Sequence, residues 1–200
     1  MRLLLATHNE HKRREFARLL ERAGGARSWQ LEALPDAVTL PPEDGETFAE
    51  NALGKARAAA AATGRVSIAD DSGIAAQALG GAPGVRSARY AGEHASDEQN
   101  LRKLLREAPA GSPLEYVCVI AYVDAQGGVE RTFEGRCRGR LAAQPRGEGG
   151  FGYDPAFVPD EQPPGARGQG WTMAELSDAQ KDAISHRGRA AHALRQWLEG

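Results

Sequence analysis

The feature that most constrains this chain is a short apolar run that ends directly in two adjacent acids. Residues 66–69 read Val-Ser-Ile-Ala, as in a buried strand, and Asp70-Asp71-Ser72-Gly73 follow at once. Because Asp, Ser and Gly favour turns, we expect a sharp turn there into one or two helical turns over 74–79. Adjacent carboxylates repel each other, so such a turn needs a cation or several donors. The pattern predicts a metal and phosphate site; the alternative is that the acids only cap the following helix.

Apolar periodicity along the rest of the chain predicts strands that alternate with helices and then a hairpin. Thr47-Phe48-Ala49-Glu50 matches a capping box in front of an alanine-rich helix that Gly64 ends. We expect strands over 3–6, 66–69, 116–123 and 129–134, and helices around residues 16–20, 48–63, 97–105 and 190–198. This order predicts an α/β fold with a mixed sheet and flanking helices.

Composition narrows the class of protein. With 200 residues, 41% of them apolar, the chain can form one domain over 1–200 with a substantial core. A net charge of -2 excludes the broad basic surface that polymeric nucleic acid requires. The two cysteines, Cys118 and Cys137, form no CxxC pair, and no stretch of ~18 apolar residues occurs. We therefore expect a cytoplasmic protein without a membrane segment or signal peptide.

A second polar segment follows the first predicted strand. It comprises Thr7, His8, Asn9, Glu10, His11 and Lys12. The amides and dipole of a helix N-terminus favour an anion, and Lys12 adds a positive charge, so a phosphate fits there. The alternative is that Thr7 or Asn9 only caps the helix while Lys12 is solvated.

Acids and a lysine surround the start of the alanine-rich helix. The capping box explains Glu50 and the helix dipole explains Glu46, which leaves Glu43 and Asp44 as candidates for a further metal contact. Asn51 and Lys55 share a helix face, so Lys55 can turn toward a phosphate; solvation is the default for an isolated lysine.

Two further segments carry aromatic groups and donors. Phe151-Gly152-Tyr153-Asp154 lies in a glycine-rich turn on which a base could stack, although such aromatics more often belong to a core. Lys181, His186 and Arg187 bring donors together at the start of the last helix, where they could read a carbonyl; solvated charges are the alternative.

Taken together, these segments resemble the noncanonical purine nucleoside triphosphate pyrophosphatase family, the inosine triphosphatase or Ham1-like enzymes. The resemblance covers nearly the whole chain, and its blocks stand in the family's order. They are Ala6-Thr7-His8-Asn9 with Lys12 and Glu15, Thr47–Ala52 with Lys55-Ala56, Ala69–Gly73, Leu79–Gly84, Ser87–Tyr90, Gly149–Pro155 and Ser185–Gly188.

The resemblance implies an elongated mixed sheet with two lobes around a substrate cleft, a homodimer, and Mg²⁺-dependent hydrolysis of ITP, dITP and XTP to monophosphate and pyrophosphate. It implies that Asp71 is the proton acceptor and a metal ligand, and that Glu43 is an acid on the metal side of the site. Asp70 would be either a metal ligand or a residue that orients Asp71. It also implies catalytic Lys12 and Lys55. The implied substrate contacts are Thr7 to Lys12, Lys55 and Ser72 at the triphosphate, and Phe151, Gly152, Tyr153, Asp154, Lys181, His186 and Arg187 mostly at the base.

Base choice follows from hydrogen bonding. Hypoxanthine and xanthine carry a 6-carbonyl acceptor where adenine carries an amino donor, so donors from His186 and Arg187 would oppose adenine. One segment departs from the family pattern: 159–170 is rich in Pro and Gly, and Trp171–Leu176 keeps only the core of the usual segment, which weakens the role given to Lys181.

Two other functions fit the same sequence. A nucleotide-binding sensor would keep the pocket without turnover, and a Maf-like pyrophosphatase would prefer pyrimidine or modified nucleotides.

Overall fold

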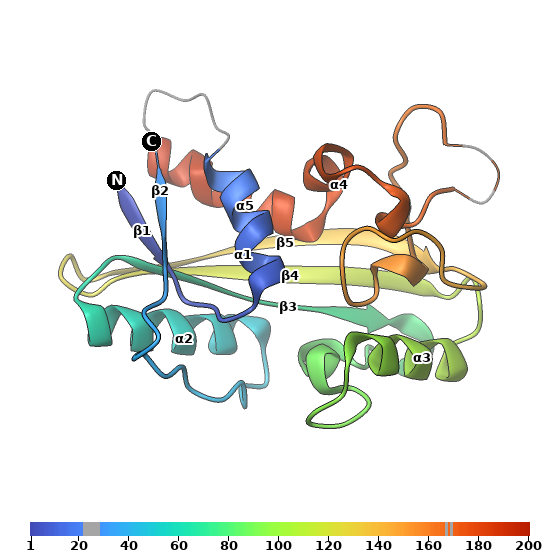
Figure 1. The fold of residues 1–200 in the computed structure, drawn as a ribbon, viewed down its shortest axis with the longest axis horizontal. Coiled ribbons are helices and arrows are strands. Elements are labelled where there is room, and N and C mark those ends of the chain that lie inside the picture. The colour runs from blue at the N-terminus through green and yellow to red at the C-terminus, as the bar shows by residue number, and fades with distance from the viewer. Residues whose placement is uncertain (22–28, 167, 169) are drawn as a thin grey trace. The chain divides into compact units, whose positions relative to one another are not determined.

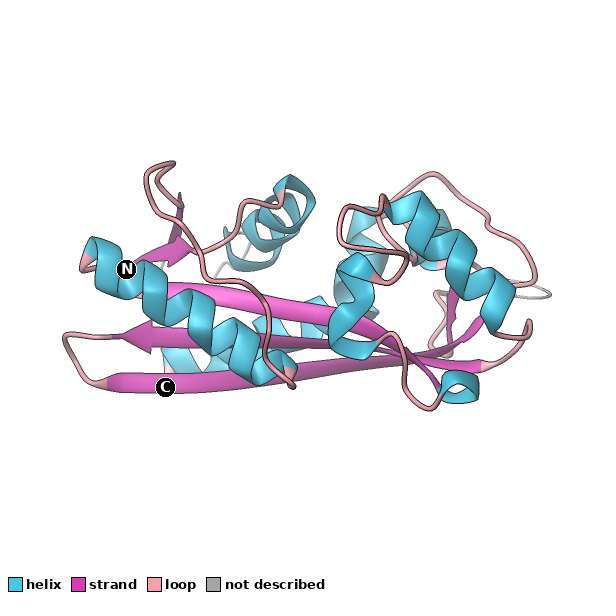
Figure 2. Cartoon of the chain, turned by 90° about the horizontal axis from the view of Figure 1, so that it is seen from below, coloured by secondary structure: helices cyan, strands magenta, loops and turns pink. Residues whose placement is uncertain are grey.

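A computed structural model describes residues 1–21, 29–166, 168 and 170–200 of the chain. Its single described sheet has six strands in the order β2-β1-β3-β4-β5-β6, and the long strands β3, β4 and β5 run alongside one another (Figures 1 and 2). The strands are β1 (Arg2–Leu5), β2 (Gln30–Ala33), β3 (Ser67–Ala76), β4 (Pro113–Asp124), β5 (Val129–Leu141) and β6 (Phe157–Pro159). β1 pairs in parallel with β2 and β3, whereas β5 and β6 are antiparallel, so the predicted mixed sheet is confirmed.

The helices occur between the strands and at the end of the chain. They are α1 (Glu10–Glu21), α2 (Phe48–Thr63), α3 (Asp97–Glu107), α4 (Asp178–Ile184) and α5 (His186–Glu199), with 3₁₀ turns η1 (Gln77–Leu79), η2 (Gly84–Arg89), η3 (Asp154–Ala156) and η4 (Met173–Glu175). The helices α1 and α2 lie in the connections between parallel strands, which require such crossovers. Within the described residues, no helix has the length and apolar content needed to cross a membrane.

The chain divides into two compact units. Unit 1 comprises Met1–Asp71, Cys118–Gly135 and Arg187–Gly200, and unit 2 comprises Ser72–Val117 and Arg136–His186. The boundary falls within β3, β4 and β5, each of which contributes residues to both units. That the chain is one domain with a cleft stays a prediction.

Unit 1 has three layers, with α1 and α5 on one face of its strands and α2 on the other (Figure 1). Alternation along each strand produces the two cores, because successive side chains point to opposite faces. Leu3, Leu5 and Ile68 pack with Phe16 of α1 and Leu194 of α5. The intervening strand positions Leu4, Ala6 and Ala69 pack instead against the alanines of α2.

Unit 2 has its own apolar core on one side of its strands. Ile74, Tyr116 and Cys137 belong to a buried cluster with Leu104 of α3 and Phe157 of β6. Alternate positions on the outer side of β5 are exposed arginines, namely Arg136, Arg138 and Arg140. The sheet of unit 2 therefore has one apolar and one polar face.

The prediction that this strand ends at Ala69 and turns at Asp70 is wrong. β3 continues through both acids, Ser72 and Gly73 to Ala76, and only the short 3₁₀ turn η1 follows. The acids therefore do not cap a helix over 74–79, and the capping alternative is wrong as well. The turn-forming residues stay extended because β3 is hydrogen-bonded to β4 and because side chains on both faces of the strand compensate its acids, whereas β1 pairs only with Ser67 and Ile68.

Other local predictions are confirmed. Thr47 is the N-cap of α2 and accepts from the Glu50 amide at 3.1 Å, while Glu50 accepts from the Thr47 amide. Gly64 ends α2 in the left-handed region at φ +66°. The segment over 159–170 that is rich in Pro and Gly includes residues 167 and 169, which lie outside the described residues.

The capping box of α2 gives a first testable prediction. Replacing Thr47 by Ala removes the hydroxyl that satisfies the Glu50 amide, so the free energy of unfolding should fall by about 1 kcal/mol. Thr47→Ser keeps that hydroxyl and should stay within about 0.5 kcal/mol of the parent. Urea denaturation of the three proteins measures both values; equal losses in Ala and Ser variants would contradict the capping role.

Candidate functional site

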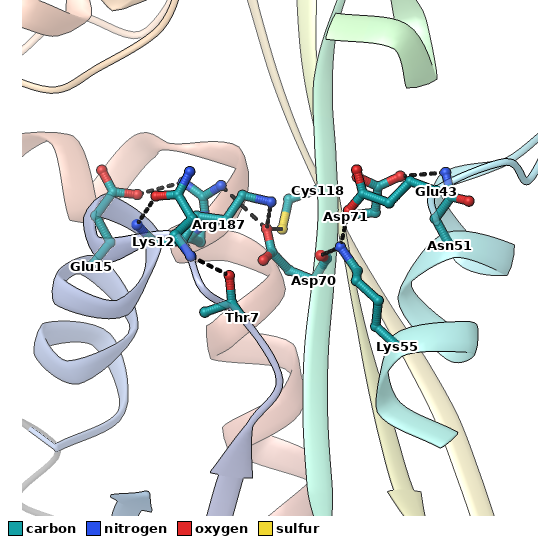
Figure 3. Close-up of polar contacts among 11 residues, drawn as sticks. Thr7, Lys12, Glu15, Glu43, Asn51, Lys55, Asp70, Asp71, Cys118 and Arg187 are labelled. Carbon is teal, nitrogen blue, oxygen red and sulfur yellow. Dashed lines mark hydrogen bonds and ion pairs between the residues drawn. The ribbon is translucent and has the colours of Figure 1, made fainter. Parts of the chain in front are cut away.

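The central feature of the site is that Asp70 and Asp71 lie on opposite faces of one extended strand. Ile68 and Asp70 share the face covered by α1 and α5, whereas Ala69 and Asp71 share the face covered by α2. Figure 3 shows the two carboxylates on either side of β3. Both side chains are buried, and alternation keeps them apart without a turn.

On the first face, Asp70 lies among cationic side chains. Its Oδ2 is 3.1 Å from Lys12 Nζ and 3.3 Å from an Arg187 guanidinium nitrogen. Arg187 also binds Glu15 from α1, and the Cys118 thiol on β4 lies 3.9 Å from Asp70 Oδ2. Three elements, α1, α5 and β4, thus converge on one carboxylate.

This surrounding charge controls the ionisation of Asp70. Burial alone would raise its pKa, but Lys12, Arg187 and Lys55 together hold the pKa well below its ordinary value. Burial lowers the pKa of Arg187, and the attraction of Asp70 and Glu15 more than offsets it, so the pKa rises above its ordinary value. Asp70 is therefore a fixed anion.

On the second face, Asp71 lies beside α2 and the segment that precedes it. Asn51 Nδ2 donates to Asp71 Oδ2 at 2.8 Å, and Asn51 Oδ1 accepts from the Gly45 amide at 2.8 Å. A Cβ at Gly45 would lie 2.6 Å from that Asn51 oxygen, so only glycine fits there. Lys55 binds Glu43 and donates to the Asp70 carbonyl at 2.6 Å. The default of a solvated Lys55 is therefore wrong.

Asp71 differs from Asp70 in its ionisation. Burial is the main cause that raises the pKa of Asp71 and the negative charge of Glu43 adds to it, while Lys55, Lys12 and the Asn51 bond oppose both. Lys55 loses solvation, but Asp70, Glu43 and Asp71 raise its pKa and keep it protonated. Asp71 is thus the more basic of the two carboxylates and the better proton acceptor.

The donor set on the second face fits a divalent cation. Asp71 and Glu43 supply carboxylate oxygens whose mutual repulsion a cation would relieve. No group of three or more His, Cys, Asp or Glu side chains suited to a metal occurs within the described ranges, so water and substrate oxygens would complete the coordination of Mg²⁺. Among the described residues, the buried Asp70 Oδ1 has no hydrogen-bond partner, and Asp70 stays a predicted ligand. Asp44 is exposed.

The turn before α1 contains both a cap and a site residue. Asn9 Oδ1 accepts from the Lys12 amide at 3.0 Å, and Thr7 Oγ1 accepts from the Asn9 amide at 3.1 Å, which confirms the capping interpretation for Asn9. Lys12 itself is bound to Asp70 rather than solvated. The other members, His8, Glu10 and His11, are exposed.

The remaining predicted residues of unit 2 form a cluster of their own, centred on Asp154. Asp154 Oδ2 accepts from Lys181 Nζ at 2.7 Å and from the Phe151 amide at 2.9 Å. Lys181 Nζ lies 5.2 Å from the centroid of the Phe151 ring. Gly150, at φ +68°, lies so close that its Cβ would be 2.1 Å from Asp154 Oδ2.

Some of the other predicted site residues in unit 2 lie at positions that differ from the prediction. The Tyr153 hydroxyl donates to the Ser87 carbonyl at 2.7 Å, and the Gly152 amide donates to Asp97 at 3.0 Å. Lys181 lies within α4 rather than at the start of the last helix, which begins at His186. Ser72 is half-buried on β3.

Comparison with known proteins identifies the family. A sequence model described as the Ham1 family matches residues 3–197. The chain belongs to the Ham1 family. A dITP/XTP pyrophosphatase of Corynebacterium glutamicum is 48% identical over 202 residues, covering 97% of this chain and 95% of that protein. The predicted family and enzyme class, a nucleoside triphosphate pyrophosphatase, are confirmed.

Solved structures of the Ham1 family share the fold. The Ham1 protein of Staphylococcus aureus superposes with a TM-score of 0.82 at 36% identity, covering 100% of this chain and 99% of that one. A structure from Mycobacterium abscessus titled nucleoside-triphosphatase / dITP/XTP pyrophosphatase gives a TM-score of 0.69 at 41% identity, covering 97% and 98%. The predicted α/β class is therefore confirmed.

Sequence reasoning missed the partners that complete this Ham1-family site. The strand predicted over 116–123 gives Cys118 and Tyr116 no role at the site, and the family resemblance gives Glu15 no role of its own. Alternation on β4 could have placed Cys118 on the Asp70 face, since Cys118, Ile120 and Tyr122 share one apolar cluster. No local pattern predicts that Arg187 binds Glu15, because 172 positions separate them.

The buried Arg187 gives a second prediction. Arg187→Met removes the cation shared by Glu15 and Asp70 and leaves their buried charges poorly compensated, so unfolding free energy should fall by about 3 to 5 kcal/mol.

The control for this change is Arg131→Met at an exposed position of β5. Its unfolding free energy should stay within about 0.5 kcal/mol of the parent value. Denaturant titration with both variants measures the difference. A loss in Arg187→Met no larger than that in Arg131→Met would show that the network is not a main source of stability.

Proposed function

We propose that this protein hydrolyses the noncanonical purine nucleoside triphosphates ITP, dITP and XTP to the monophosphate and pyrophosphate, with Mg²⁺, and thereby cleanses the nucleotide pool. The substrate class follows that of the dITP/XTP pyrophosphatases of Corynebacterium glutamicum and Mycobacterium abscessus, which this chain resembles. The single observation that carries the chemistry is the placement of the two acids on opposite faces of β3, where Lys12 and Arg187 hold Asp70 and Asn51 binds Asp71.

Asp71 acts as the general base in this proposal. It accepts a proton from a water molecule as the water oxygen bonds to the α-phosphorus. The bond from that phosphorus to the oxygen bridging the α- and β-phosphates breaks, and this oxygen leaves as part of pyrophosphate. Asn51 holds the Asp71 carboxylate in place through its 2.8 Å hydrogen bond.

Cations of the chain stabilise the charge that develops on the phosphates. Lys55 is kept protonated by the acids around it, and Lys12 binds one of these acids, Asp70, from α1. Asp71 and Glu43 would hold Mg²⁺, which when bound neutralises phosphate oxygens and helps to orient the attacking water. The turn over residues 7–12 and Ser72 are proposed to bind the triphosphate.

Recognition of the purine base is assigned to the Asp154 cluster of unit 2. Lys181 and His186 supply hydrogen-bond donors that suit a 6-carbonyl group and oppose the amino group of adenine. The ring of Phe151 is half-buried and offers a surface for stacking.

For Arg187 the geometry favours a different role from the predicted one. Its guanidinium is buried and engaged by Glu15 and Asp70, so we propose that it positions Asp70 rather than reads the base. The homodimer and the cytoplasmic location stay predictions.

A substrate panel tests the proposal directly. With Mg²⁺ present, kcat/KM for ITP, dITP or XTP should exceed that for ATP by about 10²-fold or more, because the base site pairs donors with an acceptor. Removal of divalent cations with a chelator should abolish pyrophosphate release, and added Mg²⁺ should restore it. Pyrophosphate release measured for each nucleotide gives the ranking.

Other results of the panel would favour the alternatives. Saturable binding of ITP without pyrophosphate would indicate a sensor. A preference for thymidine or uridine triphosphate would indicate a Maf-like specificity.

The site of attack gives a separate prediction. Hydrolysis of ITP in water enriched in heavy oxygen should place the label in the monophosphate, because the water oxygen bonds to the α-phosphorus. Mass spectrometry of both products checks this, and label found in pyrophosphate would contradict the assigned step.

A further inference from the structure

Tyr116 on β4 is a buried residue that touches two members of the predicted base site at once. Its ring stacks on the imidazole of His186, with centroids 4.4 Å apart and planes inclined by 6°. Its hydroxyl donates to Asp154 Oδ1 at 3.1 Å. All three residues belong to unit 2, and the Tyr116 side chain also packs on the ring of Phe157 at 4.5 Å.

The hydroxyl of Tyr116 completes the coordination of the Asp154 carboxylate. Lys181 and the Phe151 amide both bind Oδ2, whereas Tyr116 binds Oδ1. The final torsion of an aspartate is broad, so contacts on both oxygens are needed to fix the plane of the carboxylate. Asp154 is only 3% exposed, so loss of the Tyr116 donor would leave Oδ1 without an equivalent contact from bulk water.

The two contacts of Tyr116 act on different donors. Through Asp154 it determines where Lys181 Nζ lies relative to Phe151, and through stacking it holds the plane of the His186 imidazole. A site that discriminates by hydrogen bonds requires donors in fixed positions, because a misplaced donor pairs equally poorly with every base.

We propose that Tyr116 is a positioning residue that determines base specificity, acting through Asp154 and His186 without touching the nucleotide. This inference rests on the proposed function. It assigns Tyr116 no part in the hydrolysis step, since the phosphate chemistry belongs to unit 1.

The test compares Tyr116→Phe with the parent and with Tyr122→Phe. Tyr116→Phe keeps the ring and its stacking but removes the donor to Asp154, a bond to a charged group. We expect KM for ITP to rise about tenfold while kcat stays within about twofold, and the preference for ITP over ATP in kcat/KM to fall about tenfold. Tyr122, a buried tyrosine of unit 1 that packs on Trp197, should show parental kinetics after the same change.

Several outcomes would overturn the inference. If Tyr116→Phe keeps the parental KM and the parental preference for ITP, the inference is overturned. This holds even if the melting temperature falls, because a loss of stability without a kinetic change is only a structural effect. A fall in kcat at unchanged KM would also overturn it. If Tyr116→Phe does not fold, Asp154→Asn breaks the same network from the other side and must raise KM at near-parental kcat; parental KM there overturns the inference.

Failure of the proposed function gives a different pattern. In that case the parent enzyme itself shows no preference for ITP, dITP or XTP. If the parent shows that preference and the Tyr116→Phe variant keeps it, only the role proposed for Tyr116 is contradicted.

Discussion

The ion network around Asp70 is the interaction on which unit 1 depends. A carboxylate placed in the middle of an inner strand loses its hydration, and Lys12, Arg187 and Lys55 offset that loss from α1, α5 and α2. Because these helices are brought to β3 by the same contacts, the network fixes their positions and the extended backbone that carries the next residue. Asp71 owes its orientation to this arrangement.

Because successive side chains of β3 point to opposite faces, the stabilising ion network and the proposed catalytic acid lie on different faces of the strand. Asp70 faces cations that keep it ionised, while Asp71 faces Asn51, Lys55 and Glu43, where burial and a neighbouring acid raise its pKa. Two identical side chains one residue apart thereby acquire different properties. The proposed base site in unit 2 also contains a buried aspartate, Asp154, which is held by Lys181 and Tyr116.

Local signals in the sequence predicted much of this fold. The capping box at Thr47, the stop at Gly64 and the first strand all depend on short-range preferences and are confirmed. The predicted end of β3 was wrong because Asp, Ser and Gly favour turns in isolation, and pairing with β4 together with side chains on both faces of the strand keeps them extended. The buried partnerships of Arg187 and Tyr116 join distant positions, which no local pattern encodes.

The most direct test of this account compares Asp70→Asn with Asp71→Asn in both stability and turnover. Asp71→Asn should lower kcat by about 10² to 10⁴-fold with nucleotide binding and unfolding free energy close to the parent, since the Asn51 bond to the remaining oxygen survives. Asp70→Asn should lower the unfolding free energy by about 3 kcal/mol or more, because Lys12 and Arg187 lose their buried counter-charge. Near-parental kcat in Asp71→Asn, or equal destabilisation by both changes, would contradict the division of roles between the two acids.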